Sequence, residues 1–319
     1  MNKLGEFVLT VKAPFKLFCY IFFMTSILFL ISCDIPNSNE DEANESFINQ
    51  DTQVPSKSNV LPNQSGICVE DPLLFHTIKK LYQDEWELIW LEEFESTCLN
   101  ASKWNVEDWA AEKNNELQYY SPSNVKVEDG LLKLISKNEK FKGRIYTSGA
   151  VHTQGKFNFL YGKAEMRAKL PAGQGILPAF WMMPDKEDTW LPEIDILEML
   201  GQQPNEIWMV THWLDETGTL KSDANSFMGP DFSKDFHTFS IEWTPDSIVW
   251  FIDGIERFRS SEFIPSDNMY LYLNTAIGGN WPGSPDNSTV FPMYYEIDYV
   301  RVFKLKKDED VLHFYSSTN

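Results

Sequence analysis

The sequence has 319 residues, of which 43% are hydrophobic, and this is enough for one sizeable core. Its 47 acidic and 27 basic residues give a formal net charge of −20 at pH 7. A charge of this sign repels nucleic acids and anionic membrane surfaces, so nucleic-acid binding is close to excluded. The same charge disfavours sulfated and uronic polysaccharides, so a neutral partner fits better.

The N-terminal segment has the pattern of an export signal. Lys12 and Lys16 precede an apolar run, residues 17–31, that is short for a membrane-spanning helix. The run ends in Leu30-Ile31-Ser32-Cys33, which resembles the bacterial lipobox, where the cysteine becomes the lipidated first residue. We expect residues 1–33 to be a lipoprotein-type signal peptide, with Cys33 lipidated and the protein anchored at the outer membrane or cell surface. An uncleaved anchor and an ordinary signal peptide are the alternatives.

Composition divides the remainder of the chain. Residues 34–66 are polar, with few large apolar side chains, so we expect a flexible tether. A folded domain is expected at residues 67–305, followed by a short tail at residues 306–319. Cys68 and Cys98 remain as a mature pair. A disulfide and two free thiols both stay open, because the sequence does not give their separation.

Short alternating runs predict β-strands from residue 85 to residue 303. The run at residues 125–128 and the run at residues 132–136 flank the turn pair Asp129-Gly130, and a second Asp-Gly pair follows residues 248–252. No helical period is sustained over this span. Many short strands, frequent turns and no intervening helices predict an all-β sandwich of antiparallel sheets.

The most informative segment is Glu193-Ile194-Asp195-Ile196-Leu197-Glu198-Met199. Strand alternation places Glu193 and Asp195 on one face and the isoleucines on the other. Glu198 breaks this parity, and on a regular strand it would point into the core, where an unpaired carboxylate is strongly disfavoured. A β-bulge near Ile196-Leu197 would bring all three acids to the same face.

Three carboxylates on one patch cannot all ionise freely, so at least one holds its proton near neutral pH. Cleavage of a glycosidic bond needs this arrangement, because one acid protonates the departing oxygen while an ionised partner acts at the anomeric carbon. The alternative is a strand with a solvated acidic face, which leaves the parity break unexplained. The pattern therefore favours a glycoside hydrolase.

The acidic segment resembles the Glu-x-Asp-x-x-Glu signature of glycoside hydrolase family 16. An ordered series of further motifs is similar to the laminarinase branch of this family. The motifs lie at residues 114–120, 146–149, 161–165, 178–181, 236–237, 242–244, 276–283 and 297–302. Two departures stand out, Pro192 before the first Glu and Leu177 before the Pro-Ala pair, where the family usually has Gly and Trp.

The resemblance implies a β-jelly-roll sandwich with a concave substrate cleft and a retaining mechanism. Glu193 is then the nucleophile, Glu198 the acid and later base, and Asp195 the neighbour that hydrogen-bonds the nucleophile. The implied activity is endo-cleavage of β-1,3-glucan of the laminarin type, extending to mixed-linkage β-1,3/1,4-glucan. An agarase or carrageenase of the same family and a non-catalytic β-glucan-binding surface lipoprotein are the alternatives.

Sugar rings present flat C–H faces, so a sugar site usually supplies aromatic side chains together with polar groups for the hydroxyls. Packing in the core or in loops is the alternative for each candidate. The candidate substrate-binding residues are Asn115, Trp181, Trp190, His212, Trp213 and Trp281.

No His/Cys cluster has metal-ligand spacing, so we expect no cofactor for catalysis. The family resemblance implies a structural calcium ion held by Glu93, Gly130 and Asp298, and surface carboxylates without an ion are the alternative. The expected partner is a neutral β-glucan, membrane contact is expected only through the lipid, and we expect a monomer.

Overall fold

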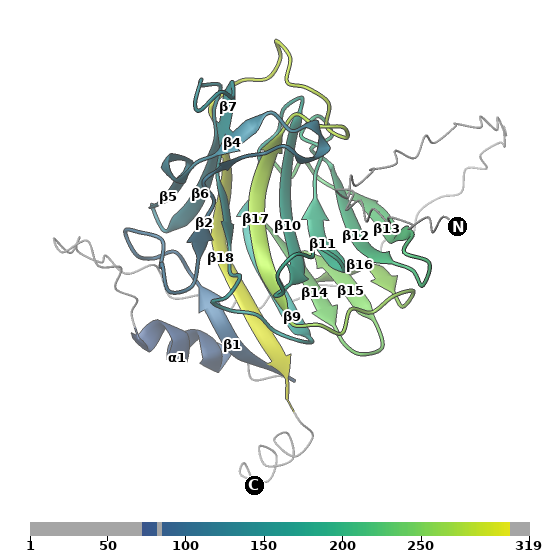
Figure 1. Cartoon of the computed structure of the whole chain (residues 1–319). Helices are drawn as coiled ribbons and strands as arrows, with labels where there is room; N and C mark the ends of the chain where they lie inside the picture. Colours follow the sequence, from purple (N-terminus) through teal and green to yellow (C-terminus); the bar gives the residue numbers. More distant parts are fainter. Residues whose placement is uncertain (1–71, 82–84, 307–319) are drawn as a thin grey trace, which may run out of the picture. The chain divides into compact units, whose positions relative to one another are not determined.

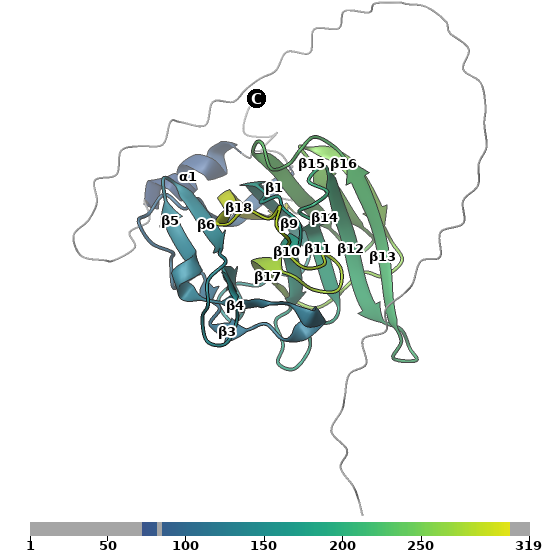
Figure 2. The ribbon, with the colours of Figure 1, turned by 90° about the horizontal axis from the view of Figure 1, so that it is seen from above.

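The computed structural model describes residues 72–81 and 85–306, and both ranges lie in one compact unit of the chain. About half of the described residues lie in strands, and these strands form three β-sheets (Figures 1 and 2). None of the helices in these two ranges has the length and apolarity that crossing a bilayer requires. The prediction of a strand-rich sandwich is confirmed.

The largest sheet has eight strands, all paired in antiparallel fashion. They are β1 (Trp86–Glu92), β5 (Val125–Glu128), β6 (Leu131–Ser136), β9 (Gly162–Lys169), β14 (His237–Trp243), β15 (Ile248–Ile252), β16 (Ile255–Ser260) and β18 (Met293–Leu305). Their order is β16-β15-β14-β9-β18-β6-β5, and β1 pairs with β18.

The second sheet has seven antiparallel strands in the order β13-β12-β11-β10-β17-β8-β2. They are β2 (Asn105–Val106), β8 (Ala150–His152), β10 (Ile176–Pro184), β11 (Glu193–Glu198), β12 (Glu206–Leu214), β13 (Leu220–Met228) and β17 (Met269–Ile277). Figure 1 shows β17, β10, β11, β12 and β13 side by side.

The remaining elements were not expected from the sequence. A three-stranded sheet contains a parallel pair, because β4 and β7 run in the same direction. Helix α1 precedes β1, and its apolar residues Leu74, Phe75 and Ile78 pack against Trp86 and Leu88. These elements are α1 (Pro72–Leu81), β3 (Trp109–Ala110), β4 (Gln118–Tyr120), β7 (Tyr146–Ser148) and the 3-10 turns at Lys113–Asn115 and Pro122–Asn124.

Both predicted Asp-Gly turns are confirmed. Asp129 and Gly130 join β5 to β6 with φ values of 58° and 70°. Asp253 and Gly254 join β15 to β16 with φ values of 52° and 73°. Tight hairpins of this kind need positive φ at both central residues, which Asp tolerates and Gly adopts freely.

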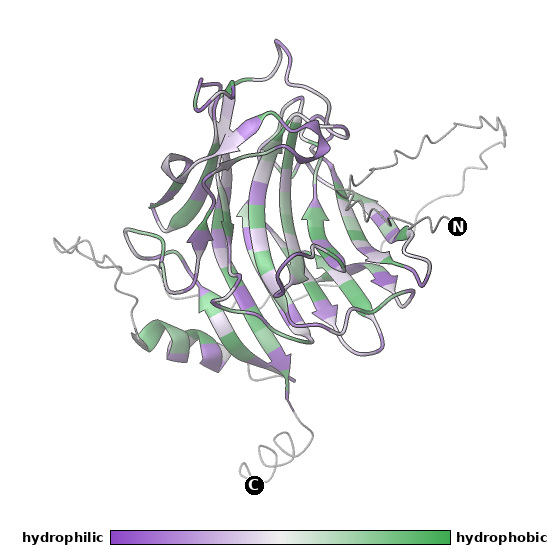
Figure 3. Ribbon diagram, viewed as in Figure 1, coloured by the Kyte–Doolittle hydropathy of each residue, from purple (hydrophilic) through white to green (hydrophobic). Residues whose placement is uncertain are grey.

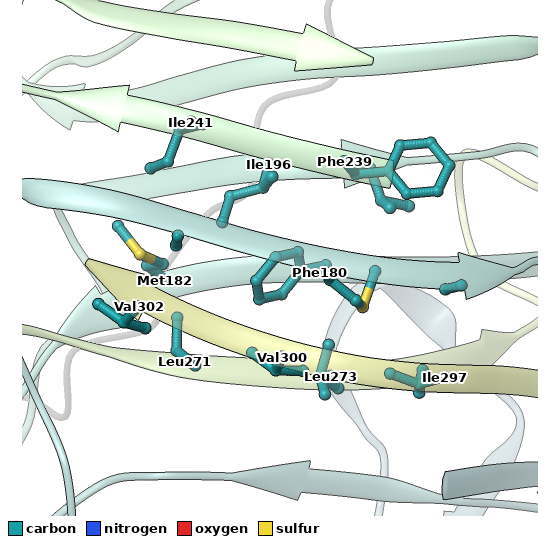
Figure 4. Close-up of a cluster of buried hydrophobic side chains, with 14 of the residues drawn as sticks. Phe180, Met182, Ile196, Phe239, Ile241, Leu271, Leu273, Ile297, Val300 and Val302 are labelled. Carbon is teal, nitrogen blue, oxygen red and sulfur yellow. The ribbon is translucent and has the colours of Figure 1, made fainter. Parts of the chain in front are cut away.

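The core lies between the two large sheets and is built from their inward-facing side chains (Figure 4). Burial of this apolar surface is the main force that holds the sheets together. The residues labelled in the figure are Phe180 and Met182 of β10, Ile196 of β11, Leu271 and Leu273 of β17, Phe239 and Ile241 of β14, and Ile297, Val300 and Val302 of β18. Polar and apolar positions succeed one another along many of the strands (Figure 3).

Strand β11 contains the predicted bulge. On the β10 side, Asp195 pairs with Trp181 and Glu198 with Ala179, so three steps on β11 oppose two steps on β10. The register on the β12 side shifts between the same two acids. The residues in between, Ile196-Leu197, are both buried in the core. The extra residue thus lets β11 place two consecutive apolar side chains in the core.

A tryptophan of the opposite sheet supports the bulge. The indole Nε1 of Trp250, on β15, donates a 2.8 Å hydrogen bond to the backbone carbonyl oxygen of Asp195. Trp250 is fully buried and stacks on Phe258 at 4.8 Å. A bulge disrupts the ladder of backbone hydrogen bonds, so its polar groups need other partners. The indole supplies one of them from across the core.

We predict that Trp250→Phe lowers the free energy of unfolding by about 1–3 kcal/mol, because a buried carbonyl loses its donor and a cavity forms. Urea denaturation measures this change. Trp243→Phe is the matched control, since the indole of Trp243 is also buried and donates a 3.1 Å bond, but to Pro265 in a loop.

Both variants should be destabilised, but only Trp250→Phe should also reduce, per folded molecule, the hydrolysis that the sequence predicts, since Trp250 alone supports the acidic strand. Equal losses of hydrolysis in the two variants would contradict a specific role for Trp250.

Candidate active site

The bulge brings the three acids of β11 to one face of the seven-stranded sheet. On β12, Glu193 pairs with His212, Asp195 with Val210 and Glu198 with Trp208. These β12 residues are two apart, so they share a face, and directly opposed residues of an antiparallel pair point to the same side. The prediction that Glu198 joins the other two acids is confirmed. We call this side of the sheet the acid-bearing face.

The acids are shielded from water to different degrees. Glu193 and Glu198 are half-buried, so both carboxyl groups remain within reach of a ligand, whereas Asp195 is only 2% exposed. Burial raises the pKa of Glu193 to about 8, and the charge of Glu198 adds to this increase, whereas the hydrogen bond with Asp195 and the charge of Lys113 oppose it. Burial also raises the pKa of Glu198 to about 7. At neutral pH the cluster therefore retains protons, as acid catalysis requires.

Asp195 also favours its protonated form. Burial raises the pKa of Asp195 well above its usual range, and the charges of Glu193 and Glu198 and its hydrogen bond with Glu193 raise it further. A protonated Asp195 is the donor in that bond, and Glu193 is the acceptor. Donation to a carboxylate favours its ionised form, so Asp195 promotes ionisation of Glu193.

His212 lies beside Asp195. Its Nε2 is 3.6 Å from Oδ2 of Asp195, beyond hydrogen-bonding distance. Burial lowers the pKa of His212 to about 4, so the imidazole is neutral at neutral pH. The structure therefore brings this predicted residue to the acids as an uncharged group.

Trp181 and Trp190 line the same face. Trp181 pairs with Asp195, donates a 2.8 Å hydrogen bond from Nε1 to Asn274 Oδ1, and packs on Tyr272 with 4.8 Å between ring centroids. Trp190 is half-buried and packs against the cluster that contains Tyr272. Both predicted tryptophans therefore lie on or against the acid-bearing face.

Aromatic and polar groups continue across the sheet. The register aligns His152, Tyr272, Trp181 and Asp195 in one row over four strands. His152 stacks on Tyr272 with an interplanar angle of 8°, and the Tyr272 hydroxyl donates a 2.8 Å bond to Glu107. Sequence reasoning missed His152, Tyr272 and Glu107, because their strands are far from β11 along the chain.

A further missed residue is Trp208, which opposes Glu198 on β12. Its ring meets that of Trp281 edge to face at 5.7 Å, and Trp281 is 42% exposed. The predicted Trp281 therefore contacts the tryptophan that lies opposite Glu198. The alternation of side chains along β12 could have identified Trp208, because Trp208 and His212 are an even number of residues apart and point to the same face.

Trp213 requires a correction. It follows His212 on β12, so its side chain points to the opposite side of the sheet, where it stacks on Phe263 with 5.1 Å between centroids. Trp213 therefore does not lie on the acid-bearing face. Of these two consecutive residues of β12, only His212 can lie on that face, because side chains alternate along a strand.

Asn115 lies at the rim of the site. Its side chain is exposed, and Nδ2 donates a 2.7 Å hydrogen bond to Oδ1 of Asn280, the residue before Trp281. Its backbone has a φ of 59°, a conformation that Asn adopts more readily than most residues. Asn115 thus joins two loops and helps to position the loop that carries Trp281.

The two departures from the family pattern have clear positions. Pro192 immediately precedes β11, where a missing N–H is tolerated. Leu177 shares the parity of Ala179 and Trp181 on β10, so it reaches the acid-bearing face as a half-buried aliphatic side chain. The face therefore has a smaller apolar surface at this point than a tryptophan would give.

The residues proposed for calcium come close together along β18. Glu92 pairs with Val300, and Leu132 with Ile297, which brings the neighbouring Glu93 and Gly130 toward Asp298. Both carboxylate oxygens of Glu93 accept bonds from Arg301 at 2.7 and 2.8 Å, and Asp298 pairs with Arg167 at 2.7 Å. Calcium would compete with these arginines for the two carboxylates. Calcium binding stays a prediction.

Cys98 is disulfide-bonded. Cys68, which the sequence leaves as its mature partner, lies outside the described residues, as do Cys33 and the predicted signal peptide and tether.

Comparison with known proteins agrees with the geometry. The model of glycosyl hydrolases family 16 matches residues 112–301. A second model, described as beta-glucan synthesis-associated protein SKN1/KRE6/Sbg1, matches residues 5–186 and ends before the three acids.

Individual relatives cover most of the described domain. A beta-glucanase of Rhodothermus marinus is 35% identical over 247 residues, which are 69% of this chain and 85% of that protein. The glucan endo-1,3-beta-glucosidase A1 of Niallia circulans is 32% identical over 259 residues, 68% of this chain and 38% of that protein. The solved laminarinase catalytic domain from Thermotoga maritima MSB8 has 36% identity and a TM-score of 0.65, covering 70% of this chain and all of that domain. The range that matches the family model contains both glutamates and the bulge between them, and the chain belongs to the glycosyl hydrolases family 16.

Proposed function

We propose that this glycoside hydrolase is endo-acting and cleaves β-1,3-glucan with retention of anomeric configuration. The observation that carries the proposal is the bulge of β11, which places Glu193, Asp195 and Glu198 on one face. Relatives whose names refer to β-glucanase, endo-1,3-β-glucosidase and laminarinase activity support the substrate class. The net negative charge of the chain also supports a neutral polymer as the substrate, because it disfavours anionic polysaccharides.

In the proposed first step, Glu193 and Glu198 act on opposite sides of the scissile bond. The Glu193 carboxylate forms a bond to the anomeric carbon while the bond from that carbon to the glycosidic oxygen breaks, and Glu198 gives its proton to the departing oxygen. Water then attacks the anomeric carbon, loses a proton to Glu198 and releases Glu193. The charge of Glu198 contributes to the raised pKa of Glu193, so the two carboxyl groups are electrostatically coupled.

The proton must reside on Glu198 when the sugar arrives. In the free site Glu198 has the lower pKa of the two glutamates. A bound sugar ring excludes water from Glu198 and raises its pKa further, whereas the hydrogen bond from Asp195 favours ionised Glu193. We therefore assign proton donation to Glu198 and nucleophilic attack to Glu193.

The side chains on the acid-bearing face have the chemistry that a glucan chain needs. Trp181 and Tyr272 offer aromatic surface for the C–H faces of sugar rings, and Trp208 and Trp281 do so beside Glu198. Glu107 and Asn274 add groups that bind hydroxyls, although both already bond to neighbouring side chains.

We also propose that the protein is exported and anchored at the outer membrane or cell surface through a lipid on Cys33, and that it acts there as a monomer. The lipobox-like residues 30–33 support the anchor. Metabolic labelling with a radioactive fatty acid should mark the wild type and spare Cys33→Ser, and equal labelling would argue against the anchor.

We predict that Glu193→Gln lowers the rate of laminarin hydrolysis about a thousandfold or more, because the amide cannot act as the nucleophile. Binding of laminari-oligosaccharides, measured by isothermal titration calorimetry, should stay within a few-fold of wild type, since Gln fills the same space. Glu187→Gln is the control, because Glu187 is exposed to solvent outside the acidic strand. Undiminished hydrolysis in Glu193→Gln would refute the assignment.

The same assay separates the alternative functions. Wild-type protein should release reducing sugar from laminarin first and from mixed-linkage β-1,3/1,4-glucan second, and the first product seen by proton NMR should be the β-anomer. Release only from agar or carrageenan would assign the chain to the galactan-cleaving alternative. Binding of laminarin without cleavage by the wild type would identify a glucan-binding protein.

The raised pKa of Glu193 also predicts a stability change with pH. Its ordinary pKa is 4.5 and its pKa in the folded state is about 8, so the folded protein holds a proton that the unfolded chain releases in this range. Stability is therefore highest below pH 4.5 with respect to this group, and it is lost as the pH rises toward 8.

In Glu193→Gln this loss should be absent, so the variant should gain about 1–3 kcal/mol over wild type at pH 8 and almost nothing at pH 4.5. Urea denaturation at the two pH values measures the difference, with Glu187→Gln as the exposed control. A variant that is less stable than wild type at pH 8 would contradict the burial argument.

A further inference from the structure

Glu193, Asp195 and His212 form a compact set of donor atoms. One carboxylate oxygen from each acid and one imidazole nitrogen all lie within 4.8 Å of one another. Among the described residues, this is the one group of three or more His, Cys, Asp or Glu side chains with such spacing. The sequence did not indicate it, because His212 is on the neighbouring strand and its pairing with Glu193 depends on the sheet register.

Two atoms of these three side chains are buried without a hydrogen-bond partner within the described structure. They are Oδ2 of Asp195 and Nδ1 of His212. Asp195 as a whole is 2% exposed, so water does not readily solvate the unpartnered oxygen. Buried polar atoms in native proteins almost always have partners, and an exception calls for an explanation such as a bound ion or ligand.

The charge of the site also favours a cation. Glu193 and Asp195 place two carboxyl oxygens within 4.8 Å of each other. A divalent cation between the two carboxylates would offset their mutual repulsion. The imidazole of His212 adds a nitrogen lone pair, which is a common ligand of transition metals.

The donor set selects the class of cation. Calcium takes six to eight oxygen ligands and magnesium needs six in an octahedron, so three donors that include a nitrogen suit neither ion. Zinc accepts mixed nitrogen and carboxylate ligands at about 2.0–2.2 Å in a four-coordinate shell. Two such bonds fit the 3.6 Å between His212 Nε2 and Asp195 Oδ2.

We propose that Glu193, Asp195 and His212 bind a zinc-class transition-metal ion, and that the ion blocks the site. The ion occupies the lone pairs that Glu193 would use against the anomeric carbon, and it fills the position next to the sugar. Metal binding itself is independent of the reaction. The inhibition that follows from it rests on the proposed function.

The test is calorimetric titration of the full chain with zinc chloride, without substrate and in a buffer that does not chelate. Wild type should bind Zn²⁺ with micromolar affinity and should be stabilised against heat, and Mg²⁺ and Ca²⁺ should not replace it at this site. His212→Asn should weaken this binding about tenfold or more, because one of three ligands is lost.

His237→Asn is the matched control. His237 is also paired with a carboxylate, since its Nδ1 lies 2.7 Å from Asp253 Oδ2, but it lies outside the acidic cluster. Unchanged zinc affinity in this variant, together with the loss in His212→Asn, would support the site. Equal affinities in wild type and His212→Asn, or no binding by wild type at millimolar zinc, would overturn the proposal.

A second measurement separates this proposal from the proposed function. Zinc should inhibit laminarin hydrolysis by wild type, a chelator should restore it, and added laminari-oligosaccharide should weaken zinc binding. If zinc binds as expected and laminarin is never cleaved, the metal site stands and the proposed function fails. If laminarin is cleaved and zinc does not bind, the proposed function stands and the metal site fails.

Discussion

The structure depends on one irregularity in one strand, and a hydrogen bond from the opposite sheet supports it. Strand β11 must place apolar side chains in the core and three carboxyl groups on the other face, and a regular strand cannot do both with the spacing of Glu198. The bulge solves this by turning Ile196-Leu197 together into the core. The indole of Trp250 then bonds the carbonyl of Asp195, so the core of the sandwich helps to fix the geometry of the site.

The same burial that fixes the acids gives them their chemistry. Asp195 is almost fully enclosed, and Glu193 and Glu198 are half-enclosed on a face lined by aromatic rings. Removal of water makes each negative charge costly, so the three groups share protons at neutral pH. A solvated acidic strand would have three ordinary carboxylates and could not supply an acid for the leaving group. Burial therefore accounts both for how the three acids are packed and for their reactivity.

The sheet register extends the site beyond β11. Pairing across four strands places His152, Tyr272 and Trp181 in line with Asp195, and pairing with β12 brings His212 beside Glu193 and Trp208 beside Glu198. A long polymer fits such a surface better than a small molecule does, because the binding groups are spread over the sheet. The imidazole of His212 also lies close enough to Glu193 and Asp195 for the three side chains to form the donor set of the proposed metal site.

The sequence determined the features that depend on local pattern. Alternation and two Asp-Gly pairs predicted the strands and hairpins, and the misplaced parity of Glu198 predicted the bulge, because the two faces of a strand differ by one residue. The tertiary structure alone decided what depends on register between distant segments. It placed His152 and Tyr272 in line with Asp195 on the acid-bearing face, and it supplied Trp250 as the partner of the bulge, since strand pairing cannot be read from local spacing.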